Sequence, residues 1–172
     1  MSLKRTLARW LQRFPPLRWG LMLAVKLLVP RHQVGAVGVV FNDAGQILLV
    51  EHVFRPNFPW GLPGGWIEAG EDPAEAVQRE LEEELQLQVD VKRLLLCKSQ
   101  GVQRGEGVPR GLGLVFYCRL IDDQLISQNT DQSRHAYEVL STEWVAPDKI
   151  RRKLTPLEAQ AIPLAQEEFE RE

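Results

Sequence analysis

The chain has 172 residues, 44% of them hydrophobic, and a formal net charge of −2 at pH 7. This length predicts one domain with enough apolar content to bury a core, and the balanced charge gives no reason to expect a nucleic acid partner. The charge is unevenly placed, because residues 1–33 carry seven Lys or Arg and no acid, while the remainder carries 14 basic and 23 acidic residues. We therefore expect a basic and apolar helical arm, residues 1–33, ahead of a domain that spans residues 34–172.

The arm contains two apolar segments. The first is a stripe at helical spacing with basic residues opposite, formed by Leu3, Leu7, Trp10, Leu11 and Phe14. The second, Trp19–Val29, is shorter than the roughly 20 residues that span a bilayer, and Lys26 interrupts it without a small-residue cleavage site, which argues against a secretory signal. Two interpretations stay open: a helix that packs on the core or on a second copy in a homodimer, or residues 1–29 contacting an anionic membrane surface.

Apolar, β-branched runs predict strands along the rest of the chain. Val34–Phe41 and Gln46–Val53 are joined by Asn42–Gly45, a hairpin signal. Further strands are expected at Trp66–Ile67, Leu87–Lys98, Leu112–Ile121 and Val139–Val145, and residues 99–111 and 122–134 are polar or rich in glycine, as loops are. Thr155–Glu158 predicts the capped start of a C-terminal helix.

The two cysteines and three histidines suggest no further site. Cys97 and Cys118 fall in predicted strands and are interpreted as buried free thiols in a reducing compartment. The expected location is therefore the cytoplasm, with peripheral membrane binding through the arm as the second interpretation. The histidines are isolated and are interpreted as structural or solvated residues: His32, His52 and His135.

The most informative segment is a short acidic helix. Asp72 is its predicted N-cap and Pro73 its first residue. Glu80, Glu83 and Glu84 fall within one arc of about 100°, although like charges at such spacing repel by roughly 0.2–0.5 kcal/mol per pair. A hard divalent cation turns that repulsion into attraction, so the pattern predicts a metal site.

The residues around this helix suit the same site. Gly64 and Gly65 allow a close backbone approach or a positive φ, and a loop ahead of a helix presents free N–H groups to phosphate. Arg79 can pair with Glu75 or Glu83 at i±4 and hold the carboxylates in place.

Together these residues resemble the signature box of the Nudix hydrolases: Gly, five residues, Glu, seven residues, Arg-Glu-apolar, any residue, Glu-Glu, any residue, Gly-apolar. The matching positions are Gly65, Glu71, Arg79, Glu80, Leu81, Glu83, Glu84 and Leu87. Gln86 replaces the late glycine, which usually ends the helix in a left-handed conformation; Gln there costs about 1 kcal/mol or shifts the helix end. The resemblance covers roughly residues 34–150. It implies an α/β fold, a Nudix-like α/β/α sandwich with a mixed β-sheet, to which the arm adds an N-terminal helical extension.

The resemblance also implies a reaction. It is that of a Mg²⁺-dependent pyrophosphohydrolase, acting on acid anhydrides, that cleaves a diphosphate linkage in a nucleoside diphosphate derivative through metal-activated water. Mn²⁺ is able to substitute. The implied metal ligands are the Gly64 carbonyl and the side chains of Glu80, Glu83 and Glu84. Gly65 and Glu71 are implied structural residues of the box, and Arg79 belongs to the catalytic set. The general base is Glu80 or a later carboxylate such as Glu138.

The substrate of this chain stays open. Candidate substrate contacts are Arg55, Trp60, Arg104 and Arg110, and the aromatic residues before the box can stack on a base or sugar, although core packing is the competing interpretation. Val102 and Gln103 stand where the related ADP-ribose enzymes tend to have proline. Two other functions remain as alternatives: a nucleotide-sensing module without turnover, and a membrane-associated hydrolase of lipid-linked diphosphates.

Overall fold

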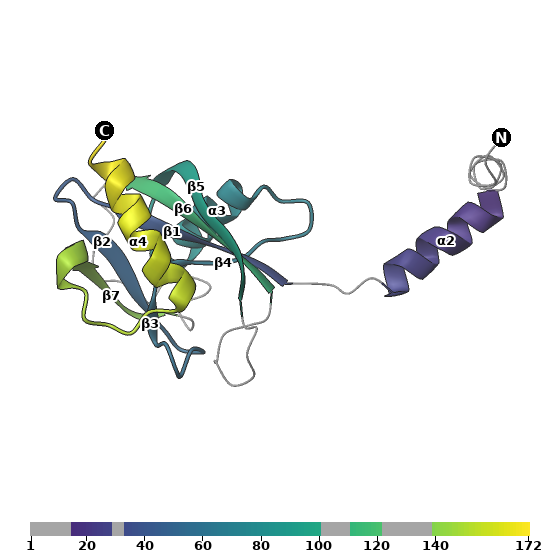
Figure 1. The fold of residues 1–172 in the computed structure, drawn as a ribbon, viewed down its shortest axis with the longest axis horizontal. Helices are drawn as coiled ribbons and strands as arrows, with labels where there is room; N and C mark the ends of the chain where they lie inside the picture. The colour runs from purple at the N-terminus through teal and green to yellow at the C-terminus, as the bar shows by residue number, and fades with distance from the viewer. Residues whose placement is uncertain (1–14, 29–32, 101–110, 122–138) are drawn as a thin grey trace. The chain divides into compact units, whose positions relative to one another are not determined.

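A computed structural model describes residues 15–28, 33–100, 111–121 and 139–172 (Figure 1). The chain divides into two compact units, residues 1–31 and 32–172. In the first unit, α2 (Pro15–Leu28) is a 14-residue helix, on which Trp19, Met22, Leu23 and Val25 are exposed. None of the helices in the described ranges is long and apolar enough to cross a membrane. The stripe from Leu3 to Phe14 lies outside the described residues, so its packing stays a prediction.

A mixed sheet forms the centre of the second unit. Its described strands are β1 (Gln33–Phe41), β2 (Ile47–His52), β3 (Trp60–Gly61), β4 (Gly64–Trp66), β5 (Val89–Gln100), β6 (Gly111–Leu120) and β7 (Val139–Val145). The order is β3-β2-β1-β6-β5, with β4 paired to β1 and β7 paired to β2. Only the β1–β6 pairing is parallel among these strands. The predicted strands are confirmed, with ends that differ by up to a few residues.

The hairpin between β1 and β2 forms where the turn residues predict it. Phe41 pairs with Ile47, and the Asn42 side-chain oxygen accepts a hydrogen bond from the Gln46 N–H at 2.9 Å. Gly45 takes a φ of 71°, which glycine adopts without steric cost. This turn sets the register that buries both strands.

Two helices cover opposite faces of the sheet. In Figure 1, α4 (Pro156–Phe169) crosses the near face of the strands, and α3 (Pro73–Leu85) lies by β4 and β5. Alternate residues of β1 point to the two faces. One core cluster joins β1, β2 and β6 to α4 through Val37, Val39, Phe41, Ile47, Leu49, Val115, Tyr117, Leu157, Ala161 and Ala165. The other joins the same sheet to α3 through Ala36, Val40, Leu48, Val50, Val77, Leu81, Phe116 and Cys118. The α/β/α sandwich implied by the resemblance is therefore confirmed.

The prediction for the two cysteines is only half correct. Both lie in strands, and Cys118 is buried, which raises the pKa of its thiol. Cys97, however, is exposed. It lies on β5, the last strand of the main sheet path, and the pairing of β5 with β6 shifts between Leu94 and Leu96. An edge strand with such an irregularity has fewer neighbours to cover its side chains.

Candidate active site

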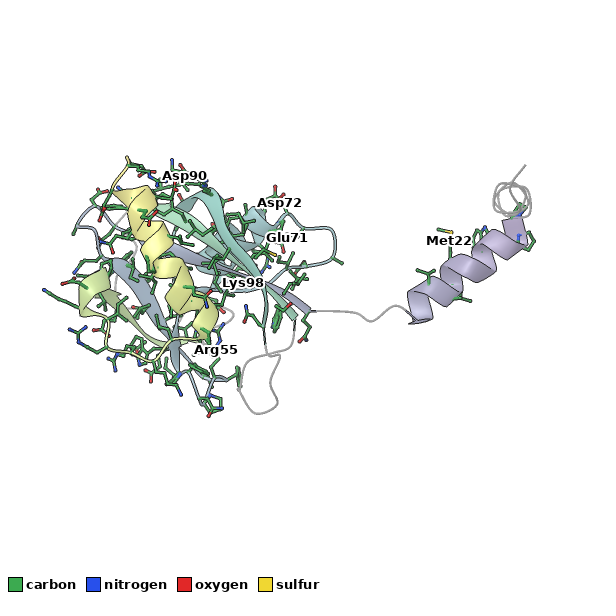
Figure 2. The ribbon with its side chains drawn as sticks, in the orientation of Figure 1. Met22, Arg55, Glu71, Asp72, Asp90 and Lys98 are labelled. Carbon is green, nitrogen blue, oxygen red and sulfur yellow. The ribbon has the colours of Figure 1, made fainter. Side chains whose placement is uncertain are left out.

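A cavity of about 790 Å³ lies in the second unit. One part of its lining, which we call the carboxylate wall, consists of Glu68, Glu80, Glu83 and Glu84. Another part, which we call the Arg55 wall, consists of His52, Phe54, Arg55, Phe58 and Thr155. Arg55 and Glu71, labelled in Figure 2, come from separate loops, one between β2 and β3 and the other before α3.

The sequence of α3 explains why its carboxylates face the cavity. The helix begins at Pro73, and the Asp72 side chain accepts a hydrogen bond from the Ala74 N–H at 2.8 Å, as the N-cap prediction requires. Val77 and Leu81 are fully buried against the sheet. Because the apolar stripe fixes the rotation of the helix, the three box glutamates are held along the cavity.

Gln86 ends α3 in the left-handed conformation. Its φ and ψ are 56° and 32°, and it is the one non-glycine residue with positive φ among those described. The Gln86 N–H donates to the Glu82 carbonyl at 3.0 Å, and the Leu87 N–H donates to the Leu81 carbonyl at 3.1 Å. The helix thus ends where a glycine would end it, so Gln86 bears backbone strain that glycine would not.

The glycine pair makes two different close approaches. Gly64 has a φ of 135°, and a Cβ there would lie 2.3 Å from the Ala36 carbonyl oxygen. A Cβ on Gly65 would instead lie 2.4 Å from Cδ of Glu80. The first glycine lets β4 pair with β1, and the second leaves room for the Glu80 carboxylate. Both uses of glycine that the sequence predicts, positive φ and close approach, are present.

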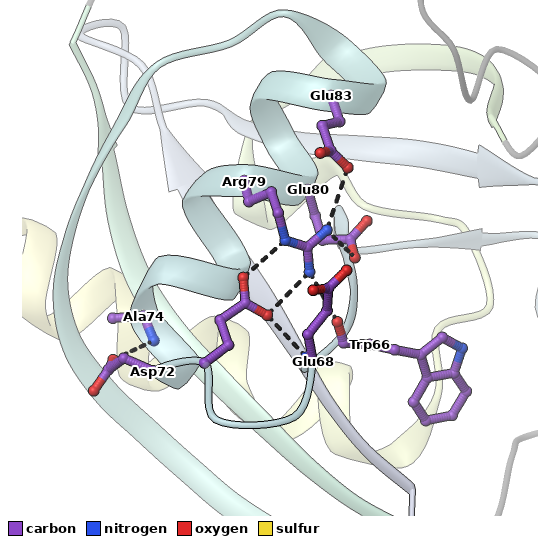
Figure 3. A network of polar contacts seen from close by, with 8 residues as sticks. Trp66, Glu68, Asp72, Ala74, Arg79, Glu80 and Glu83 are labelled. Carbon is purple, nitrogen blue, oxygen red and sulfur yellow. Dashed lines mark hydrogen bonds and ion pairs between the residues drawn. The ribbon is translucent and has the colours of Figure 1, made fainter.

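Arg79 holds the loop before α3 (Figure 3). Its Nε and Nη2 donate to the two carboxylate oxygens of Glu71 at 2.8 and 3.1 Å, and Nη2 also donates to the Trp66 carbonyl at 3.1 Å. Glu71 in turn accepts from the Glu68 N–H at 2.9 Å. The bond to Arg79 lowers the pKa of Glu71, and the bond to Glu71 raises the pKa of Arg79. Glu71 therefore joins Arg79 of α3 to the backbone of the loop before that helix, and its role as a structural residue of the box stays a prediction.

The same guanidinium also reaches the carboxylate wall. Nη1 of Arg79 lies 2.9 Å from Glu80 Oε1 and 3.3 Å from Glu83 Oε2. The pairing with Glu83 is the predicted i, i+4 pair. Of the two predicted alternatives, Glu75 is not the partner, because Arg79 turns towards Glu71 across the loop instead. One cation thus gathers three carboxylates, an arrangement with excess negative charge.

The predicted metal ligands line one cavity without forming a metal-binding geometry. Within the described ranges, no group of three or more Asp, Glu, His or Cys side chains is placed to hold a metal ion. Arg79 accounts for part of this, since Glu80 and Glu83 both turn an oxygen to it. The donor set itself fits a hard cation, because three carboxylates and the Gly64 backbone border the same cavity. The ligand assignment stays a prediction.

Arg55 is hydrogen-bonded to a buried glutamate, Glu158, which the sequence predicts only as part of a helix cap. Glu158 lies in the first turn of α4, is 3% exposed, and completes the predicted capping box with Thr155. Its Oε1 accepts from Arg55 Nη1 at 3.0 Å and from the Leu62 N–H at 3.2 Å. The motif Thr155–Glu158 was the signal for the cap; the contacts with Arg55 and Leu62 span about a hundred residues of sequence and leave no local pattern.

His52 is a half-buried residue beside Arg55. Burial and the charge of Arg55 lower the pKa of His52 to about 3. Its Nε2 atom is buried and has no hydrogen-bond partner in the part of the chain that the structure covers. His52 also lines the cavity, and its interpretation as a structural or solvated residue stays a prediction.

The remaining predicted residues fall elsewhere. Trp60 packs partly buried against the α4-side core, with the Arg152 guanidinium 4.4 Å from its ring centroid, and the cavity lining does not include it. Arg104, Arg110 and Glu138 lie outside the described residues, so their roles stay predictions.

Comparisons with known proteins identify the family of this chain. The family model of the NUDIX domain matches residues 31–166. A MutT-like protein of Streptomyces ambofaciens is 30% identical over 131 residues, which span 76% of this chain and 74% of that protein. An ADP-ribose pyrophosphatase of Methanocaldococcus jannaschii is 36% identical over 100 residues, 55% of each chain. The solved structure of a MutT NUDIX hydrolase from Burkholderia pseudomallei, at 25% identity, superposes with a TM-score of 0.60 over 78% of this chain and 98% of its own. With the box in place and the family model covering most of its length, the chain belongs to the Nudix family.

Proposed function

We propose that this protein is a Mg²⁺-dependent hydrolase that cleaves the diphosphate linkage of a nucleoside diphosphate derivative. The observation that carries the proposal is the gathering of Glu71, Glu80 and Glu83 around Arg79, of which Arg79, Glu80 and Glu83 line the cavity. The names of relatives support the substrate class, since one is an ADP-ribose pyrophosphatase. Mn²⁺ is an alternative ion, because it accepts the same oxygen ligands.

The chemistry requires a way to offset negative charge. A diphosphate resists attack because its own oxygens repel a nucleophile. When bound, a divalent ion supplies neutralisation of those oxygens and a water of lowered pKa. The residues proposed to hold it are the Gly64 carbonyl and the side chains of Glu80, Glu83 and Glu84.

The chain's own side chains then orient the carboxylates and accept the proton of the attacking water. Arg79 directs the carboxylates of Glu80 and Glu83 through its bonds at 2.9 and 3.3 Å. Glu80, or Glu138 from the segment before β7, accepts a proton from the attacking water. The water oxygen bonds to phosphorus, the bridging P–O bond breaks, and the second phosphate leaves. On the other wall, Phe54, Phe58 and Arg55 offer rings and donors for a base or sugar. We also retain Arg104 and Arg110 as proposed phosphate contacts.

The test is the substitution Glu83→Gln with Glu82→Gln as its matched control. Glu82 and Glu83 are both exposed neighbours on α3, but only Glu83 lines the cavity. Turnover of nucleoside diphosphate derivatives at limiting Mg²⁺ should fall by about 100-fold or more in Glu83→Gln and stay unchanged in Glu82→Gln, with both variants folded by circular dichroism. Equal turnover in Glu83→Gln and the wild type would exclude the proposed ligand role. Nucleotide binding without product from the wild type would favour a sensing module.

A membrane-associated enzyme is a second candidate, favoured by α2. Trp19, Met22 and Leu23 are 72%, 65% and 58% exposed on that helix, within an arm that carries seven basic residues. Such a helix can lie in an anionic membrane surface. Sedimentation with anionic vesicles by the full chain, lost on deletion of residues 1–33, would support the membrane-associated enzyme. A shift from dimer to monomer on the same deletion, without vesicle binding, would support packing of the arm between two copies.

A further inference from the structure

We propose that Glu158 is a positioning residue that holds Arg55 as half of a charge-balanced pair, so that Arg55 contacts an uncharged oxygen of the substrate, on its base or sugar, and not a phosphate. This inference rests on the proposed function, because it names how the substrate of that same cavity is recognised. It concerns the Arg55 wall only, and it requires nothing of the carboxylate wall.

The two carboxylate oxygens of Glu158 accept hydrogen bonds from different parts of the chain. Oε2 accepts from the N–H and the hydroxyl of Thr155 at 2.9 and 2.7 Å, which closes the first turn of α4. Oε1 accepts from Arg55 at 3.0 Å and from the Leu62 N–H at 3.2 Å. A helix cap uses only the first set of bonds. The second set fixes Arg55, whose side chain borders the cavity, and therefore ties the start of α4 to substrate recognition.

Gly61 leaves room for this pair. A Cβ added at position 61 would lie 2.7 Å from Glu158 Oε1, 3.0 Å from Arg55 Nη1 and 3.2 Å from His52 Nε2. Three polar atoms from β2, the β2–β3 loop and α4 thus surround one backbone position that carries no side chain. Such a close approach constrains where the guanidinium can lie.

The charges of Arg55 and Glu158 cancel each other, and the Lys153 Nζ atom, 4.7 Å from the Phe58 ring centroid, belongs to a residue outside the cavity lining. Glu158 is buried and contributes one negative charge beside the single positive charge of Arg55, while His52 is neutral at physiological pH because its pKa is about 3. A phosphate placed here would meet a pair without net charge, next to a buried carboxylate. The remaining N–H groups of Arg55 still donate hydrogen bonds, and they suit a neutral carbonyl or hydroxyl oxygen. Phe54 lines the same cavity and is exposed, so it provides a ring face for a planar base, whereas Lys153 already lies over the ring of Phe58.

The experiment compares Arg55→Met, Glu158→Gln and the double variant, with the ion pair Arg152–Glu143, 3.1 Å apart and outside the cavity lining, as the matched control. KM and kcat are measured with Mg²⁺ on a nucleoside diphosphate sugar that the wild type cleaves. Arg55→Met and Glu158→Gln should each raise KM about fivefold or more, as loss of a hydrogen bond from a charged donor does, with kcat within about twofold of the wild-type value. The double variant should equal Arg55→Met, and the controls Arg152→Met and Glu143→Gln should leave KM unchanged.

Two readouts separate positioning from a merely structural role. If Glu158 acted only on folding, Glu158→Gln would lower the melting temperature without changing KM in the folded enzyme, which would overturn the inference. A change in KM that persists in the Arg55→Met background would also overturn it. If Glu158→Gln does not fold, Arg55→Lys keeps the cap and the charge but loses the bond geometry, and an unchanged KM in that variant would overturn the inference.

The salt dependence of KM in the double variant tests whether Arg55 contacts a neutral oxygen or a phosphate, because removal of both partners leaves the net charge of the pair unchanged. Contact with a neutral oxygen predicts the same fold-change in KM at about 50 mM and about 500 mM salt, whereas contact with a phosphate predicts a smaller change at high salt. Calorimetry with a nucleoside diphosphate in the absence of metal isolates this wall from the reaction. Weaker binding by Arg55→Met and Glu158→Gln, together with a wild type that never turns over, would uphold the inference while refuting the proposed function. Unchanged binding would overturn the inference whether or not turnover occurs.

Discussion

Two arginines border the same cavity, and they meet their glutamates in opposite ways. Arg79 pairs with Glu80 and Glu83 of the carboxylate wall and with Glu71 beside it, so this wall has more negative than positive charge. Arg55 faces the single carboxylate of Glu158, so this pair in the Arg55 wall is balanced. Excess charge at one wall suits a cation and its phosphates, and balance at the other suits a neutral group. The difference teaches that the number of carboxylates around an arginine, and not the arginine alone, decides what a wall can bind.

The largest expected effect on stability comes from Gly64→Ala, which we compare with the same substitution of Gly65. Gly64→Ala places a methyl group 2.3 Å from the Ala36 carbonyl at a φ of 135°, so we expect a loss of about 3 kcal/mol or more in unfolding free energy. Gly65→Ala meets the flexible end of Glu80 instead, and should lose turnover while losing less stability. Chemical denaturation of both variants checks the prediction. An equal loss of stability in the two would show that Gly65 serves the strand pairing and not the carboxylate wall.

Substitution of Arg79 tests whether the surrounding carboxylates need this cation to take their working positions. Arg79→Met frees Glu71, Glu80 and Glu83 from their shared partner, and we expect turnover at saturating Mg²⁺ to fall by about 10–100-fold, as loss of groups that orient metal ligands does. The control is Arg93→Met, because Arg93 pairs with Glu168 at an exposed site and such pairs contribute little. Normal turnover in Arg79→Met would mean that the carboxylates reach their working positions without it.

The lowered pKa of His52 predicts that the free energy of unfolding depends on pH. His52 has an ordinary pKa of 6.5 and a folded-state pKa of about 3, so below pH 6.5 the unfolded chain binds a proton that the folded chain excludes. Stability is therefore fully present above pH 6.5 and falls as the pH drops towards 3, by up to about 1.4 kcal/mol per pH unit. In His52→Gln this contribution is absent. Denaturation curves at several pH values should show a shallower acid slope for the variant, and parallel slopes would contradict the neutral state of His52.

The smallest expected effect is at the end of α3. Gln86→Gly relieves the left-handed strain at φ 56°, and should raise the unfolding free energy by about 1 kcal/mol. Gln86→Ala keeps a Cβ in the same conformation and should leave stability close to that of the wild type. Thermal melts of the three proteins decide between these outcomes. A stabilised Gln86→Ala would indicate that the glutamine side chain, and not its backbone, is the source of the strain.

Local patterns were enough to predict much of this protein. The hairpin at Asn42–Gly45, the N-cap at Asp72 and the capping box at Thr155–Glu158 all form as predicted, because each depends on residues within four positions of one another. The face of α3 that carries Glu80, Glu83 and Glu84 follows from helical periodicity alone. The exposure of Cys97 was mispredicted, because it depends on which strand lies at the sheet edge.

By itself, the sequence determined the family, the box and the wall on which the acidic side chains lie, since spacing along one helix is a local property. The tertiary structure decided what those side chains meet. It brought Glu71 to Arg79 from the preceding loop, and it placed Glu158 of α4 on Arg55 across about a hundred residues. The physical reason is that an ion pair between distant segments depends on how the helices pack on the sheet, and that packing is set by the whole core and not by any short stretch of the chain.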